Sequence, residues 1–160
     1  MQIETAIIAA IASFVGAWIA ARLAFARFSQ EKIWERKAAA YTAIFEALHY
    51  IGRWYEKHYE AALVRRDIEG EKTTRIKDEA IKAEDELERR LGSETWLIPP
   101  ECRARLEKMT QDLKNAEHKD PEWESFLENC AFIIKTAVDD LRLMVVDDLR
   151  LSRKWYEKLL

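Results

Sequence analysis

The apolar run at residues 7–28, IIAAIASFVGAWIAARLAFARF, constrains the fold more than any other feature. No charged side chain lies between Thr5 and Ala21, and the run continues through Ala26 if the long stem of Arg22 carries its charge outward. About 20 apolar residues form about 30 Å of helix, which is the hydrocarbon thickness of a bilayer. The sequence therefore predicts a single N-terminal transmembrane helix, residues 1–28, followed by a second domain, residues 29–160.

A helix buried in a protein core and a cleaved signal peptide are the two alternatives for this run. A small domain has little core in which to bury a helix that is apolar on all sides. A signal peptide has a basic start and a shorter apolar stretch, whereas this chain begins MQIE. The basic residues follow the run, namely Arg22, Arg27, Lys32, Arg36 and Lys37. Because basic residues stay on the cytoplasmic side, we expect a bacterial inner membrane protein with its N-terminus outside.

Small residues recur along the same run and indicate a surface for helix association. They form two ridges with a four-residue repeat: Ala9, Ser13, Ala17 and Ala21 make one, and Ala12, Gly16, Ala20 and Ala24 make the other. Such surfaces let two helix backbones approach closely in lipid. We therefore expect these residues to mediate homo-oligomerisation. The alternative is a lone anchor in which alanine is only a filler.

The rest of the chain predicts an all-α fold. With 4 Gly and 3 Pro there are few places to turn, and strong helix formers dominate. Apolar residues recur at three- and four-residue steps in four stretches: Trp34 to Ala62, Ile76 to Leu91, Cys102 to Ala116 and Trp123 to Leu149. We expect the first helix to end near Gly70, Pro99 and Pro100 to open the third helix, and Asp120 to cap the fourth. Short connections favour antiparallel neighbours, so residues 29–160 should form a cytosolic antiparallel four-helix bundle.

Charge and composition narrow the possible ligands. The net charge of −3, with both signs intermixed, gives no basic stripe for a phosphate backbone, so no DNA partner is predicted. Cys102 and Cys130 fall at apolar helix positions without the spacing of a zinc or redox motif, so buried thiols are expected. No glycine-rich phosphate loop and no His-Glu-x-x-His pair occur, and neither a cofactor nor a metal is predicted.

Two pairs of neighbouring carboxylates are candidate metal ligands. The doublets are Asp139-Asp140 and Asp147-Asp148, and Arg142, Arg150 and Arg153 lie within helical reach of them. No histidine accompanies them, so they are interpreted as charge-balanced surface. Asp148 falls near the apolar seam of its helix and could interrupt it with a polar group.

The stretch RWYEKH, Arg53 to His58, is the one candidate for catalysis. Histidine can act as a general base while arginine holds a phosphate. Five residues turn a helix by about 500°, which leaves the two side chains about 140° apart. A core or interface histidine is therefore the alternative. A separate set, His49, Arg53, Glu56 and Glu60, shares an outer helix face and is either a polar cluster at a subunit contact or a solvated face.

An N-out span, a helical bundle and an Arg-x(4)-His motif together resemble the small membrane-anchored HEPN-like accessory proteins of type VI-B CRISPR systems. The resemblance implies membrane rings or pores that add to antiviral defence when the RNA-guided nuclease is triggered. Trp54 departs from the pattern, since active HEPN nucleases usually have Asn, Asp or His after the arginine.

These features predict a membrane-anchored homo-oligomeric effector that permeabilises or depolarises the membrane. Its expected partners are membrane lipid, further copies of the chain, and a cytosolic protein or the RNA-guided nuclease. One alternative is a membrane-tethered HEPN-type ribonuclease with Arg53 and His58 as catalytic residues. Another is a non-enzymatic membrane adaptor or scaffold.

Overall fold

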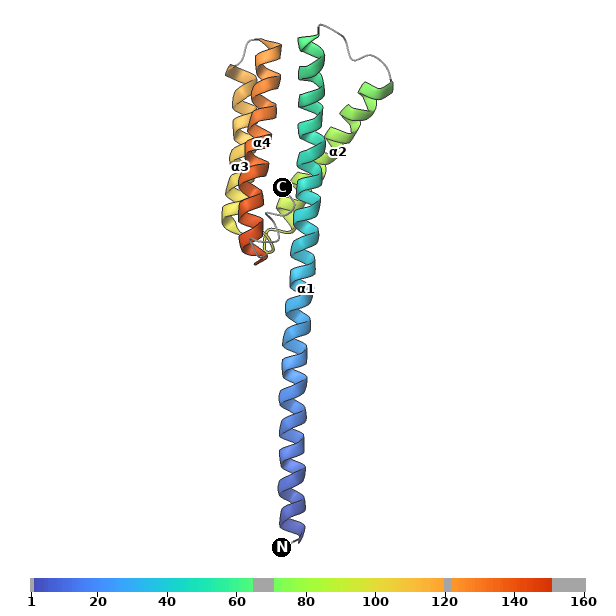
Figure 1. Ribbon diagram of the computed structural model, residues 1–160, viewed down its shortest axis with the longest axis vertical. Coiled ribbons are helices and arrows are strands. Elements are labelled where there is room, and N and C mark those ends of the chain that lie inside the picture. The colour runs from blue at the N-terminus through green and yellow to red at the C-terminus, as the bar shows by residue number, and fades with distance from the viewer. Residues whose placement is uncertain (1, 65–70, 120–121, 151–160) are drawn as a thin grey trace. The chain divides into compact units, whose positions relative to one another are not determined.

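The computed structural model describes the backbone of residues 2–64, 71–119 and 122–150. Side chains are described in the same ranges except at 2–12, 71–72 and 117–119. These ranges contain four α-helices and no strand: α1 (Gln2–Leu63), α2 (Glu71–Ser93), α3 (Pro100–Lys119) and α4 (Trp123–Asp148) (Figure 1). The all-helical prediction is therefore confirmed for the described part of the chain.

The chain divides into two compact units, Met1–Arg36 and Lys37–Leu160, which we call unit 1 and unit 2. Helix α1 contributes residues to both units, because no proline interrupts it between Gln2 and Leu63. The predicted anchor ended at residue 28, eight positions before the division after Arg36.

The predicted transmembrane helix is wrong. Among the described residues, no helix is both long enough and apolar enough to cross a bilayer. Length is not limiting in α1, which has 62 residues. The apolar character is limiting, because Arg22 and Arg27 interrupt the described part of the run. The predicted single-pass location in an inner membrane, with the N-terminus outside and the bundle in the cytosol, is therefore wrong as well.

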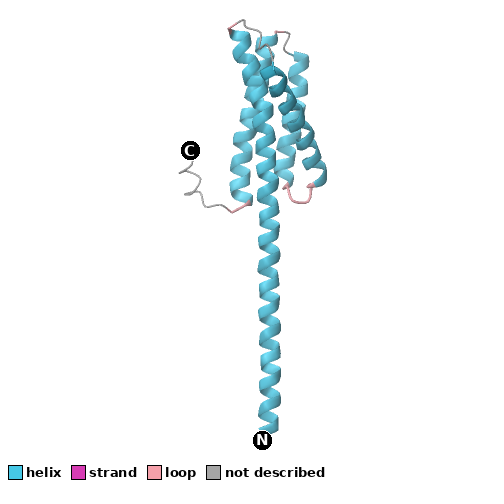
Figure 2. Ribbon diagram, turned by 90° about the vertical axis from the view of Figure 1, so that its right-hand side faces the viewer, coloured by secondary structure: helices cyan, strands magenta, loops and turns pink. Residues whose placement is uncertain are grey.

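Unit 2 is a helical bundle with one hydrophobic core. Consecutive helices run in opposite directions, and α3 lies against α4 along its length (Figure 1). Figure 2 shows the described elements coloured by secondary structure, and all of them are helices. All four helices and the connection before α3 supply buried side chains: Tyr41, Ile44, Ala47, Leu48, Ile51, Ala83, Leu87, Ile98, Cys102, Leu106, Met109, Ile134, Ala137, Leu141 and Val145. Most of these occupy the apolar positions that the three- and four-residue spacing predicts, and the bundle prediction is confirmed.

Two tryptophans predicted to line the core are exposed instead. Trp34 is 48% exposed and belongs to unit 1, not to the part of α1 that supplies the core. Trp123 is 55% exposed at the first turn of α4, where its ring stacks on Phe126 with the centroids 5.5 Å apart. The periodicity of apolar residues identifies the face of a helix that is buried. It does not show at which residue along the helix the neighbouring helices stop covering that face.

The helix ends follow the predicted signals in part. Pro100 is the first residue of α3, as expected for a residue with a fixed φ and no N–H to leave unpaired. Helix α1 ends at Leu63 and not near Gly70, which lies outside the described residues. Helix α4 has Glu122 as its N-cap, without a side-chain hydrogen bond, whereas the predicted cap, Asp120, lies outside the described residues.

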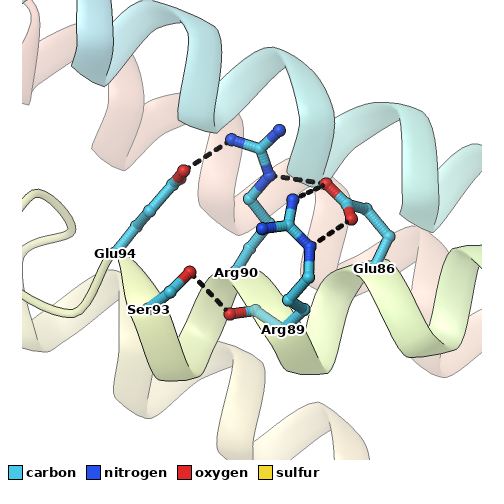
Figure 3. A network of polar contacts seen from close by, with 5 residues as sticks. All are labelled: Glu86, Arg89, Arg90, Ser93 and Glu94. Atoms are coloured by element: carbon cyan, nitrogen blue, oxygen red, sulfur yellow. Dashed lines mark hydrogen bonds and ion pairs between the residues drawn. The ribbon is translucent and has the colours of Figure 1, made fainter.

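Polar contacts between side chains of the same helix support α2. The carboxylate of Glu86 accepts hydrogen bonds from Arg89 and from Arg90, with N–O distances of 2.6 to 2.7 Å (Figure 3). Arg90 also donates to Glu94 at 2.6 Å. These hydrogen bonds hold the pKa of Glu86 down to about 2. Each pair is three or four residues apart, the spacing at which helical side chains meet.

Candidate functional site

A groove of about 420 Å³ lies between α1 and α4 in unit 2. Its apolar lining consists of Phe45, Leu48, Gly52, Ala131, Ile134 and Val138, and its charged or polar lining of His49, Arg53, Glu56, Lys135, Asp139 and Arg142. The groove therefore combines an apolar surface with both signs of charge.

Gly52 permits α1 and α4 to approach at the groove. A Cβ atom built at this position would lie 3.3 Å from Cγ2 of Ile134, which is tighter than an ordinary van der Waals contact. A larger residue would force Ile134 to move. The glycine thus sets the separation of the two helices at this level of the bundle.

The predicted polar cluster on α1 is found in part at this groove. His49, Arg53 and Glu56 all line it, whereas Glu60 pairs with Lys57 at 2.5 Å. Helix α4 adds Lys135, Asp139 and Arg142 to the lining, and Asp139 accepts a hydrogen bond from Arg142 at 3.0 Å. The residue spacing within α1 could not predict these three residues, because they belong to another helix. No group of three or more metal-ligating side chains occurs among the described residues.

The structure does not bring Arg53 and His58 together. Arg53 lines the groove and lies 3.6 Å from the carboxylate of Glu79 on α2. His58 is outside the groove lining, with its Nδ1 atom 2.8 Å from the carbonyl oxygen of Trp54. Its ring also lies against the Trp54 ring, with centroids 4.3 Å apart. Within one chain the two residues face different surroundings, and their catalytic role stays a prediction.

Asp148 interrupts the apolar seam of α4, as its position in the sequence indicated. Its carboxylate accepts hydrogen bonds from Lys37 at 2.8 and 3.0 Å and from the Tyr41 hydroxyl at 2.8 Å. The Tyr41 oxygen lies 3.9 Å from Sγ of Cys102. This cluster joins α1, α3 and α4 at one end of the core.

The chemistry of this cluster is structural. Burial, together with the hydrogen bond to Asp148, raises the pKa of Tyr41 well above its ordinary value of 10.0. Burial also raises the pKa of the Cys102 thiol above 9.0. A protonated phenol and a protonated thiol are poor bases and poor nucleophiles. The cluster therefore fixes helices and does not offer an activated group.

Both aspartates of the first doublet, Asp139 and Asp140, accept hydrogen bonds from arginine. Asp140 accepts a hydrogen bond from Arg105 of α3 at 2.6 Å, while Asp139 is bound by Arg142 of its own helix. Arg105 was not among the arginines expected to balance these charges, because it lies on another helix.

Large apolar side chains are exposed along α1 in unit 1. Nine large apolar side chains are 47% to 74% exposed there: Phe14, Val15, Trp18, Ile19, Leu23, Phe25, Phe28, Ile33 and Trp34. The small residues predicted to mediate association that are described, Ser13, Gly16, Ala17, Ala20, Ala21 and Ala24, are exposed among them. The side chains of Ala9 and Ala12 lie outside the described residues.

Comparisons with family models, with curated proteins and with solved structures found no match to this chain. The resemblance to HEPN-like accessory proteins therefore stays a prediction, as do the antiviral role and the partnership with an RNA-guided nuclease. The exposed apolar side chains of unit 1 are the feature of this chain that a proposal for its function can be based on.

Proposed function

We propose that this protein is a self-associating scaffold in which residues 13–36 of α1 join copies of the chain. Each copy then contributes one helical bundle to the assembly. The proposal keeps the homo-oligomerisation expected from the sequence and assigns it to an exposed surface of α1.

The observation that supports the proposal is the density of exposed apolar side chains along one stretch of helix. Large contiguous apolar patches are rare on monomeric proteins and usually mark an interface. Phe14 and Phe25 are 74% and 72% exposed, so most of each ring remains to be buried. Covering a Phe or Trp side chain completely contributes about 1.5–3 kcal/mol, so a few such rings can offset the entropy lost on association.

Self-association is favoured over recruitment of a different protein because the surface is apolar and helical on every copy. A helix that displays such a stripe can bury it against the same stripe of a second copy, which is the simplest symmetric arrangement. Aromatic residues are also the type enriched at the centres of protein interfaces.

Light scattering on matched variants tests the proposal. In size-exclusion chromatography with multi-angle light scattering, the full chain should have a molar mass above 18.8 kDa. Phe25→Glu should lower the mass to that of one chain, since a carboxylate would be buried at the contact. Phe132→Glu is the control, because Phe132 is 66% exposed on α4 of unit 2 and its substitution should leave the oligomer intact.

Both variants should retain wild-type far-UV circular dichroism, because neither Phe25 nor Phe132 belongs to the buried core. A monomeric wild type would overturn the proposal. Dissociation by Phe132→Glu, with Phe25→Glu still oligomeric, would place the contact on unit 2 and overturn it equally.

A further inference from the structure

We infer that unit 1 forms a parallel, in-register, two-stranded coiled coil whose seam is Phe14, Trp18, Ala21, Phe25 and Phe28. This inference rests on the proposed self-association and adds its stoichiometry, orientation and register. A second copy of the same helix thus covers the seam side of the exposed apolar surface of unit 1.

The spacing of the seam residues is that of a heptad repeat. The steps from Phe14 to Phe28 are four, three, four and three residues, so they alternate between the two core positions, d and a, of a heptad. Phe14, Ala21 and Phe28 occupy d positions, and Trp18 and Phe25 occupy a positions. The four aromatic side chains are 55% to 74% exposed, so the whole seam is open to a partner.

Charged residues mark the end of the seam. The next a and d positions are Lys32 and Glu35, whose side chains form an ion pair at 2.6 Å within the same helix. The Lys32 ammonium lies 5.7 Å from the centre of the Phe28 ring. In a two-stranded coil a lysine at an a position can extend its ammonium to water, whereas larger bundles enclose that position more completely.

The side positions of the seam favour close, two-stranded contact. Ala21 at a d position leaves room for the helix backbones to approach, and Ala17 and Ala24 at the flanking g positions add little bulk. Arg22, at an e position, lies with its guanidinium carbon 5.4 Å from the centre of the Trp18 ring. Its aliphatic stem can shield the edge of the seam while its charge stays in water.

Charge complementarity sets the orientation. In a parallel coiled coil, a residue at g faces the e residue five positions later on the other helix. Glu31 at g would then face Arg36 at e of the second copy, and the two-fold symmetry of the dimer would give two such ion pairs. Neither Glu31 nor Arg36 has an ion pair within the described part of the chain. An antiparallel pairing centred between Ala21 and Phe25 would instead bring two Arg22 side chains together.

Disulfide trapping tests the register. In the full chain, Ala21→Cys should give a covalent dimer on mild oxidation, because identical d positions face each other at a distance that a disulfide can span. Ala20→Cys is the matched control one residue away, at an outer c position, and should remain largely uncrosslinked. Cys102 and Cys130 are buried, so the wild type under the same oxidation should give no dimer.

A charge exchange tests the orientation independently. Glu31→Arg and Arg36→Glu should each weaken dimerisation by about five-fold in sedimentation equilibrium, because each replaces two attractions by two repulsions. The double variant should restore the wild-type dissociation constant. A double variant as weak as the single ones would overturn the parallel orientation.

The outcomes also distinguish a failure of the coiled-coil seam from a failure of the proposed self-association. If the wild type is oligomeric but Ala20→Cys forms as much crosslinked dimer as Ala21→Cys, the proposed seam is wrong and self-association still stands. A monomeric wild type would overturn both.

Discussion

Asp148 fastens the end of α4 to α1 through the Lys37 ammonium and the Tyr41 hydroxyl. The side chains of Lys37 and Asp148 are only 25% and 17% exposed, so little water can replace either partner. Asp148→Ala should therefore lower the free energy of unfolding by about 2–3 kcal/mol. Urea denaturation monitored by circular dichroism measures this change.

The neighbouring residue provides the control for this prediction. Asp147 is exposed, and its replacement by alanine should change the free energy of unfolding by no more than about 0.5 kcal/mol. Equal effects of the two substitutions would show that the carboxylate at position 148 does not hold the helices together.

At the scale of the single helix, α2 should respond to acid through Glu86. Its pKa of about 2 in the folded protein lies below the ordinary 4.5, because Arg89 and Arg90 donate hydrogen bonds to the carboxylate. The contribution of this carboxylate to stability is therefore complete above about pH 4.5 and is lost as the pH falls toward 2. The effect is small because the group is screened by water.

Thermal unfolding of Glu86→Gln checks the sign of this dependence. The wild type should have the higher Tm at pH 7, and the difference should shrink as the pH falls from 4.5 toward 2. Glu88→Gln is the control, since Glu88 is exposed on the same helix and has no ion pair in the described part of the chain. A difference that widened on acidification would contradict the assignment.

Replacing each of two helical glycines by a larger residue should change the free energy of unfolding in opposite directions. Gly92 of α2 has no atom within 4 Å of an added Cβ, so Gly92→Ala should stabilise the protein by about 0.5–1 kcal/mol through helix propensity. Gly52→Leu should destabilise it by about 1–3 kcal/mol, because Ile134 already lies 3.3 Å from the Cβ position. Urea denaturation of both variants is the measurement. A stabilising Gly52→Leu would mean that α1 and α4 are not held close at the groove.

At the scale of the whole molecule, apolar periodicity predicted most of the fold but only part of the candidate site. The helices and most core positions follow from local spacing, because each helix buries one stripe. Leu97 and Ile98 are buried in the connection between α2 and α3, where no periodicity could identify them. The α1/α4 groove also escaped prediction, since it depends on which helices become neighbours.

The apolar run of unit 1 shows a different limit of sequence reasoning. Alanine and aromatic residues are compatible with lipid and with a protein interface, so composition alone favoured a membrane span that the structure does not support. The four-and-three spacing from Phe14 to Phe28 was the more specific signal.

The molar mass of the intact chain across a dilution series tests the central claim most directly. Self-association through residues 13–36 predicts twice 18.8 kDa at high concentration, falling toward 18.8 kDa on dilution. A molar mass of 18.8 kDa at the highest concentration attainable would contradict it.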